Sequence, residues 1–147
     1  MDGPAGRPDM AYYSFTNKLR KGETIQIFNY GNCRHDFTYV DDVVEGVVRV
    51  MSGATERYAI YNIGGGQPES LLDFVQILQE ELVRAGVLPD DFDFEAHKQL
   101  VPMQPGDVPT TYADTSVLER DFGFTPKITL REGLRHFAEW YKSFYLP

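Results

Sequence analysis

The chain has 147 residues, a length typical of one domain, and a formal net charge of −8. This acidic balance argues against nucleic acid or an anionic membrane as the main partner, so any bound anion must be held by local cations. Hydrophobic residues make up 42% of the sequence, as in ordinary globular proteins, and no apolar run approaches the length of a transmembrane helix.

The cysteine content and the first residues favour a cytoplasmic protein. Cys33 is the only cysteine, so the chain cannot form an internal disulfide, which fits a reducing compartment. The sequence MDGPAGRPDM at residues 1–10 lacks the apolar core of a signal peptide.

Residues 1–9 are rich in glycine and proline and predict a loop, followed by a helix over residues 10–21. Gly22 fits the position just past the end of this helix. Arg7 lies in the loop, where a solvated cation is its simplest interpretation. Taken alone, this first segment therefore predicts no site.

The stretch TIQIFNYGNCRHDFTYVDDVV at residues 24–44 has features of a nucleotide-binding segment. Residues 24–28 are rich in β-formers and predict a short strand, and residues 29–36 predict a polar loop. An aromatic side chain can stack on a base, a glycine lets the backbone come close, and cations can meet phosphate. The candidates are Phe28 and Tyr30 for the base and Arg34 and His35 for phosphate, with Gly31 as the glycine of the loop. The alternative is that the aromatic residues belong to the core and that the loop binds nothing.

The next elements are a helix over residues 41–51 and a strand over residues 58–63. Asp41 or Asp42 is placed to cap the helix, which is a commoner role for paired carboxylates than metal binding or acid–base chemistry. Three glycines at 64–66 follow the strand, but their spacing does not match the G-x-G-x-x-G dinucleotide loop. They predict a tight turn.

The C-terminal half predicts helices over residues 70–84, 114–122 and 129–145. Ser70 with Asp73, and Thr129 with Glu132, match the spacing of a capping box. The acidic stretch at residues 90–95 predicts an exposed strand rather than a calcium loop.

Residues 101–111 contain three prolines and predict a rigid, non-helical loop. Gln104 and Asp107 in this loop are candidates to bind ligand hydroxyls, because rigid loops often carry binding groups. A proline-braced turn in which Asp107 caps a local amide fits the residues equally well.

Five motifs occur in one order: GRPDM at 6–10, FNYG at 28–31, DFTYVDDVVEG at 36–46, YNIG at 61–64 and MQPGDVPTTYADTS at 103–116. Together they resemble the C-terminal half of a UDP-glucuronate 4-epimerase, an NAD-dependent epimerase/dehydratase of the extended short-chain dehydrogenase/reductase family. The resemblance runs from about residue 3 to residue 145. It implies an α/β fold with a small mixed sheet flanked by helices, forming a single substrate-binding domain over residues 1–147 of a Rossmann-type enzyme.

The resemblance also implies a site for a UDP-hexuronate. Arg7 would bind the C6 carboxylate of a hexuronic acid in a bidentate manner, a planar match that lysine would not provide. Phe28 and Tyr30 are the candidates to cover a face of uracil. Gln104 and Asp107 would lie near the ribose and the diphosphate.

One position departs from the family pattern. The family has an arginine immediately before the aspartate of DFTY, where it meets the diphosphate, and this chain has His35 there with Arg34 one residue earlier. A neutral imidazole cannot replace a permanent charge at pH 7. Three outcomes stay open: Arg34 takes over the role, phosphate binding is weaker and depends on pH, or the substrate preference has changed.

The resembled enzymes oxidise a sugar hydroxyl with NAD and then reduce the ketone from its other face. That chemistry needs a G-x-x-G-x-x-G loop and a Tyr-x-x-x-Lys pair, and this sequence has neither. We therefore expect a UDP-sugar (UDP-glucuronate or UDP-galacturonate) as ligand, but no catalytic residue, metal or NAD on this chain alone. NAD would be bound mainly by a separate N-terminal Rossmann domain. Without that domain, this chain would expose apolar surface and would tend to self-associate. The alternative is a non-catalytic nucleotide-sugar-binding or partner-docking module.

Overall fold

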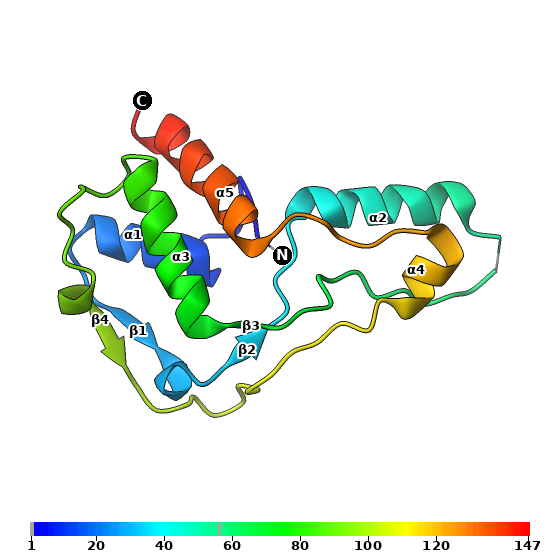
Figure 1. Cartoon of the computed structure of the whole chain (residues 1–147), viewed down its shortest axis with the longest axis horizontal. Helices are drawn as coiled ribbons and strands as arrows, with labels where there is room; N and C mark the ends of the chain where they lie inside the picture. Colours follow the sequence, from blue (N-terminus) through cyan, green and yellow to red (C-terminus); the bar gives the residue numbers. More distant parts are fainter. Residues whose placement is uncertain (1, 56) are drawn as a thin grey trace.

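The computed structural model describes residues 2–55 and 57–147 (Figure 1). The α-helices in this part of the chain are α1 (Ala11–Arg20), α2 (Val40–Gly53), α3 (Leu71–Arg84), α4 (Ser116–Phe122) and α5 (Leu130–Tyr145). The strands are β1 (Ile25–Ile27), β2 (Arg34–His35), β3 (Glu69–Ser70) and β4 (Lys98–Leu100). Two short 3₁₀ segments are η1 (Phe28–Gly31) and η2 (Glu95–His97). The predicted α/β class, with a small amount of sheet flanked by helices, is confirmed, but the strands form two separate sheets rather than one mixed sheet.

The sheet is divided into two separate two-stranded ladders. β1 pairs with β4 in parallel, and β2 pairs with β3 in the antiparallel direction, which places His35 opposite Glu69. An isolated bridge between Arg34 and Thr110 attaches the loop after β4 to β2. The strand predicted at residues 90–95 is wrong, because the chain turns there and β4 begins only at Lys98.

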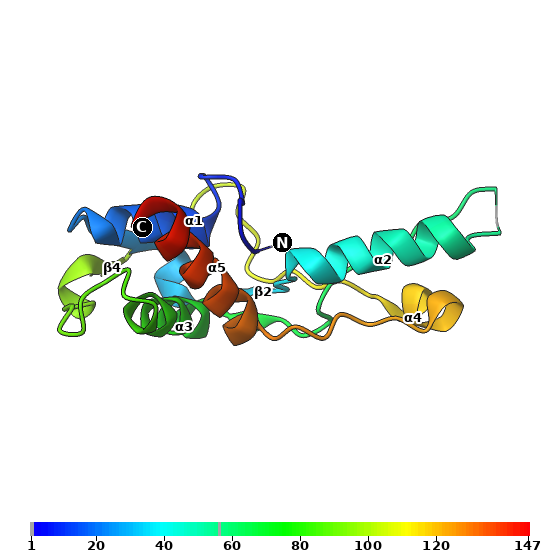
Figure 2. The ribbon, with the colours of Figure 1, turned by 90° about the horizontal axis from the view of Figure 1, so that it is seen from above.

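The helices α1, α3 and α5 pack around β1 and form the main lobe (Figures 1 and 2). Their apolar stripes recur at helical spacing, so each helix turns one side toward the same interior. The most deeply buried side chains of this core are Leu19, Ile25, Ile27, Phe74, Leu78, Leu82, Leu134, Phe137 and Tyr141. The Thr129 hydroxyl accepts a hydrogen bond from the backbone N of Glu132, so the predicted cap of α5 is confirmed. The Ser70 side chain makes no cap hydrogen bond, so the capping box predicted for α3 is wrong.

A buried carboxylate joins α3 to α5. The Glu81 side chain is only 2% exposed and forms ion pairs with Arg84 at 2.6 Å, Arg131 at 3.1 Å and Arg135 at 3.4 Å. Burial pushes the pKa of Glu81 upward, but hydrogen bonds from Arg84 and Arg131 outweigh it and lower that pKa below its ordinary value of 4.5. The carboxylate is therefore held ionised at the interface of the two helices.

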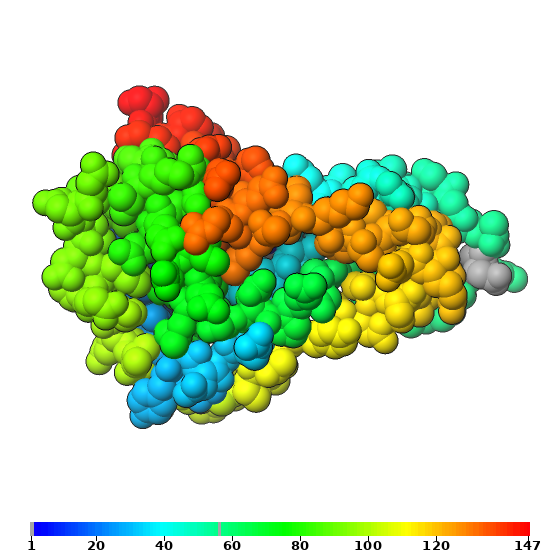
Figure 3. Space-filling view, in the orientation of Figure 1, coloured from blue at the N-terminus to red at the C-terminus, as the bar shows by residue number. Residues whose placement is uncertain are grey.

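The helices α2 and α4 and the chain around them form a narrower extension of the main lobe (Figures 1 and 3). The only buried residues of α2 are Asp42 and Gly46. The apolar residues Val44, Val47, Val48 and Met51 are exposed. The strand predicted at residues 58–63 is wrong: the segment is irregular and pairs with no strand among the described residues.

None of the helices described is both long and apolar enough to cross a bilayer.

Asp42 does not cap α2 as predicted. The N-cap residue is Tyr39, and the Asp42 carboxylate instead accepts hydrogen bonds from the backbone N atoms of Lys127 at 3.0 Å and Ile128 at 2.8 Å. This carboxylate ties the first turn of α2 to the segment that leads into α5.

Candidate functional site

A cavity of about 320 Å³ lies where β1, β2, the start of α1 and the loop after β4 meet. It brings together three of the predicted site residues, Phe28, His35 and Asp107. Apolar side chains, among them Phe15, Phe37, Leu71 and Val108, make up much of the remaining lining, with Gln26 and Cys33. The cavity combines an apolar interior with a few polar groups, as small-molecule sites usually do.

The backbone separates the two candidate aromatic residues. After Phe28, both Asn29 and Tyr30 adopt left-handed backbone conformations, with φ of 50° and 51°. Asparagine tolerates this conformation well, whereas tyrosine rarely adopts it, and the Tyr30 backbone N is held by the Val101 carbonyl at 3.0 Å. The strand therefore does not continue through Asn29. Phe28 lines the cavity, while Tyr30 is 54% exposed and does not line it.

The loop that carries Asp107 is fastened to β2 by hydrogen bonds. The backbone N of Arg34 donates to the Pro109 carbonyl at 2.8 Å, and the backbone N of Thr111 donates to the Arg34 carbonyl at 3.0 Å. One oxygen of the Asp36 carboxylate accepts from the backbone N atoms of Gly66 and Ala113, both at 3.0 Å. These contacts position the wall of the cavity that Asp107 and its neighbours form.

The two basic candidates of β2 lie differently, because successive side chains of a strand point to opposite faces. His35 lines the cavity, with its Nδ1 3.2 Å from the Thr111 hydroxyl oxygen and its ring edge-on to Phe37. Arg34 is exposed, is not part of the lining, and donates from Nη2 to the Pro68 carbonyl at 2.7 Å.

The remaining candidates also lie outside the lining. Arg7 is exposed and pairs with Asp9 at 3.3 Å in the N-terminal loop. Gln104 is exposed, and its backbone carbonyl accepts from the backbone N of Asp107 at 3.2 Å, which forms a turn in the loop. The cavity therefore contains three of the seven residues predicted.

Sequence reasoning missed two residues that organise the site, Asp36 and Thr111. Both lie inside motifs that carried the resemblance, DFTYVDDVVEG and MQPGDVPTTYADTS. That position in the motifs was the available signal, but their hydrogen bonds join residues about 75 positions apart, which no local pattern reveals.

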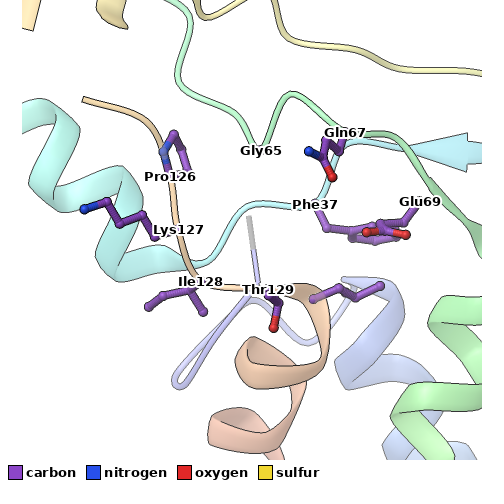
Figure 4. A pocket seen from close by; sticks show the side chains of 9 residues that line it. Phe37, Gly65, Gln67, Glu69, Pro126, Lys127, Ile128 and Thr129 are labelled. Carbon is purple, nitrogen blue, oxygen red and sulfur yellow. The ribbon is translucent and has the colours of Figure 1, made fainter. Parts of the chain in front are cut away.

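A second cavity of about 250 Å³ lies between the glycine-rich turn and the segment that enters α5 (Figure 4). Gln67, Lys127 and Thr129 are among its lining residues, and Phe37 lines both cavities. No group of three or more His, Cys, Asp or Glu side chains in the described ranges could hold a metal ion.

The chain belongs to the GDP-mannose 4,6 dehydratase family, whose model matches residues 11–137. This membership and the comparisons below agree with the resemblance to the C-terminal part of an extended short-chain dehydrogenase/reductase epimerase or dehydratase. UDP-glucuronate 4-epimerase 4 of Arabidopsis thaliana is 37% identical over 97% of this chain and 34% of its own length.

Two solved structures superpose on almost the whole chain. The UDP-glucuronic acid 4-epimerase of Bacillus cereus, in complex with UDP-glucuronic acid and NAD, has a TM-score of 0.79 and 28% identity over 97% of this chain and 43% of its own. The UDP-glucose 4-epimerase of Thermotoga maritima, with UDP-glucose, has a TM-score of 0.80 and 27% identity over the same shares. The chain thus spans less than half the length of these relatives.

Proposed function

We propose that this chain is the nucleotide-sugar-binding portion of an NAD-dependent 4-epimerase, with a UDP-hexuronate as its ligand. The observation that carries the proposal is the cavity that places Phe28 beside His35 and Asp107. Residues 1–147 would form a single substrate-binding domain. The Bacillus cereus relative is in complex with UDP-glucuronic acid and NAD, and the Thermotoga maritima relative is in complex with UDP-glucose, which supports this class of ligand.

The residues of the cavity fit the parts of such a ligand. Phe28 offers a ring face to uracil, Asp107 can accept hydrogen bonds from ribose hydroxyls, and His35 can donate to the diphosphate. Tyr30 and Gln104 would contact the part of the ligand that extends beyond the lining, whereas Arg34 is engaged by the Pro68 carbonyl.

Arg7 would meet the C6 carboxylate of the hexuronate. Its present partner is Asp9, and both side chains are more than 70% exposed. Such an exposed pair contributes only about 0–1 kcal/mol, so a bidentate carboxylate could replace it at little cost.

The chemistry would require a second domain. NAD would act as the oxidant and reductant in the intact enzyme and would be bound mainly outside this chain, which has no G-x-x-G-x-x-G loop. The uncovered apolar face of α2 supports docking of such a domain and, in its absence, self-association. The compartment we propose is the cytoplasm, in line with a cysteine content that excludes internal disulfides.

Calorimetric titration with UDP-glucuronate tests the proposal. We expect saturable binding by the wild-type chain, and a loss of about 1–3 kcal/mol in binding free energy for Phe28→Ala, the usual value of a base–aromatic stack. Phe144→Ala is the control, because this exposed α5 side chain does not line the cavity. Equal affinities of Phe28→Ala and wild type would contradict the site, and NAD-dependent epimerisation by this chain alone would contradict the non-catalytic role.

The exposed face of α2 also supports the second candidate, a partner-docking module. Such a module would bind a protein partner through Val44, Val47 and Val48 without binding a UDP-sugar. The same titration distinguishes the two candidate functions, because only a nucleotide-sugar-binding domain is expected to bind UDP-glucuronate.

A further inference from the structure

We propose that His35, oriented by Thr111, selects the charge of the ligand in this cavity, so that a diphosphate binds while the imidazole is protonated and is lost as the imidazole becomes neutral. This inference rests on the proposed nucleotide-sugar function and assigns the residue that controls it.

The charged side chains that line the cavity determine which ligand charge it can accept. His35 is the only lining residue among those described that can become positive, and Asp107 is the only carboxylate. With a neutral imidazole the cavity therefore carries one negative charge, which repels a diphosphate. With an imidazolium the two charges balance, and a charge-assisted hydrogen bond to phosphate becomes available.

Arg34 does not supply this charge. Its guanidinium donates to the Pro68 carbonyl and lies outside the cavity lining. The structure thus separates two explanations that the sequence leaves open, because the arginine is engaged elsewhere and the histidine faces the cavity.

The other charged groups near His35 are acidic. Glu69 lies opposite His35 in the β2–β3 ladder, and Asp107 faces it from the loop after β4. Asp36 follows His35 in the chain, and its carboxylate accepts from the backbone N atoms of Gly66 and Ala113. None of these carboxylates can attract an anion, so among the side chains that line the cavity in the described part of the chain only the imidazolium can do so.

Thr111 can hold the ring in both of its charge states. Its hydroxyl oxygen accepts from the backbone N of Asp36 at 3.2 Å and lies 3.2 Å from the Nδ1 of His35. The hydroxyl can donate to an unprotonated Nδ1 or accept from a protonated one. The Nε2 atom makes no hydrogen bond to the residues that the structure describes, so it is the nitrogen available to a phosphate oxygen.

Titration with UDP-glucose at pH 6 and pH 8, at constant ionic strength, tests the inference. This probe is suitable because both of its phosphates are esterified, so its own charge does not change over that interval. If binding needs the imidazolium, the affinity should be several-fold weaker at pH 8 than at pH 6. Uridine, which has no phosphate, should bind equally at both pH values.

Variants of the histidine and the threonine sharpen the test. His35→Arg should bind tightly at both pH values, and His35→Gln weakly at both. Thr111→Val should weaken binding at pH 6 while the pH dependence remains, because the ring keeps its titration but loses its orientation. His136→Gln is the matched control: this histidine contacts the Tyr39 ring and does not line the cavity, so the wild-type pH dependence should remain.

Two kinds of result overturn the inference, and they are distinguishable. If wild type binds UDP-glucose equally at both pH values, or if His35→Gln keeps the full pH dependence, the role of His35 is wrong while the binding site stands. If wild type binds at neither pH, the inference falls. In that case binding of UDP-glucose by His35→Arg would still support the site. If neither wild type nor His35→Arg binds UDP-glucose, the proposed function is rejected as well.

Discussion

The main lobe and the α2–α4 extension both contain helices with an apolar stripe, but only the main lobe buries that stripe. In α3 and α5 the apolar stripe is buried against α1 and β1, whereas in α2 the valine stripe faces outward and Met51 is 80% exposed. An apolar stripe stabilises a helix only when another element covers it. We therefore expect the main lobe to carry most of the free energy of unfolding, and the extension to depend on a partner.

The largest effect should come from truncating an aromatic residue at the centre of the main lobe. Phe137→Ala removes a fully buried ring that packs on Tyr12, with ring centroids 4.8 Å apart, and should lower the free energy of unfolding by about 3–5 kcal/mol. Urea denaturation measures this loss. Phe144→Ala on the same helix is the control, because its ring is 63% exposed, and it should cost less than about 1 kcal/mol. Equal losses would contradict the central, buried position of Phe137 in the main lobe.

The buried charge between α3 and α5 should give the next largest effect. Glu81→Gln removes the carboxylate that accepts from three arginines and should cost about 1–3 kcal/mol near neutral pH. Because the folded state lowers the pKa of Glu81, its contribution is present above pH 4.5 and is lost as the pH falls through the lowered value. The two proteins should therefore converge in stability in acid.

Denaturation of wild type and Glu81→Gln at several pH values checks this convergence. The matched control is Glu139→Gln, which removes an exposed partner of Arg84 and should cost below about 1 kcal/mol. A difference between wild type and Glu81→Gln that persists unchanged below the lowered pKa would contradict the electrostatic explanation.

A pair of glycine substitutions compares how tightly the two regions are packed. In the main lobe, a Cβ at Gly133 would lie 2.7 Å from an Asp2 carboxylate oxygen and 3.0 Å from the Tyr39 ring, so Gly133→Ala should cost about 1–2 kcal/mol. In the extension, a Cβ at Gly46 would meet the tip of Ile63 at 3.0 Å. The same Cβ would lie 3.2 Å from the Phe124 ring, so the contacts are slightly looser than at Gly133. Gly46→Ala should therefore change stability by less than about 1 kcal/mol after the gain in helix propensity.

Thermal unfolding of both variants measures the difference. A larger loss for Gly46→Ala than for Gly133→Ala would show that the extension is packed as tightly as the lobe, and would reverse the comparison.

The smallest effect on folding is expected on the uncovered face of α2. Val48→Lys replaces a half-exposed valine and should change the free energy of unfolding by less than about 0.5 kcal/mol. It should reduce self-association, because it places a charge in the apolar patch. Sedimentation velocity over a range of concentrations measures this, with Gln76→Lys on the exposed side of α3 as control. Association that is the same in all three proteins would exclude α2 as the contact surface.

The candidate site was predictable in part. The aromatic residue at the end of β1, the histidine of β2 and the aspartate of the proline-rich loop were all proposed from motifs, and the structure places Phe28, His35 and Asp107 around one cavity. The orientation of each side chain was not predictable. Tyr30 lies outside the cavity because the chain turns after β1, and Arg34 lies outside it because it points to the other face of β2, where its guanidinium donates to the Pro68 carbonyl.

The helices of the main lobe and the α/β class were predictable from local patterns, because helical spacing and caps such as Thr129 act between residues a few positions apart. Three features were not predictable in this way: where Asp42 makes its hydrogen bonds, that residues 58–63 pair with no described strand, and which apolar stripe is covered. Those outcomes depend on neighbours far away in the chain. A local pattern can state that a face is apolar, but only the packing of distant segments determines whether that face is buried.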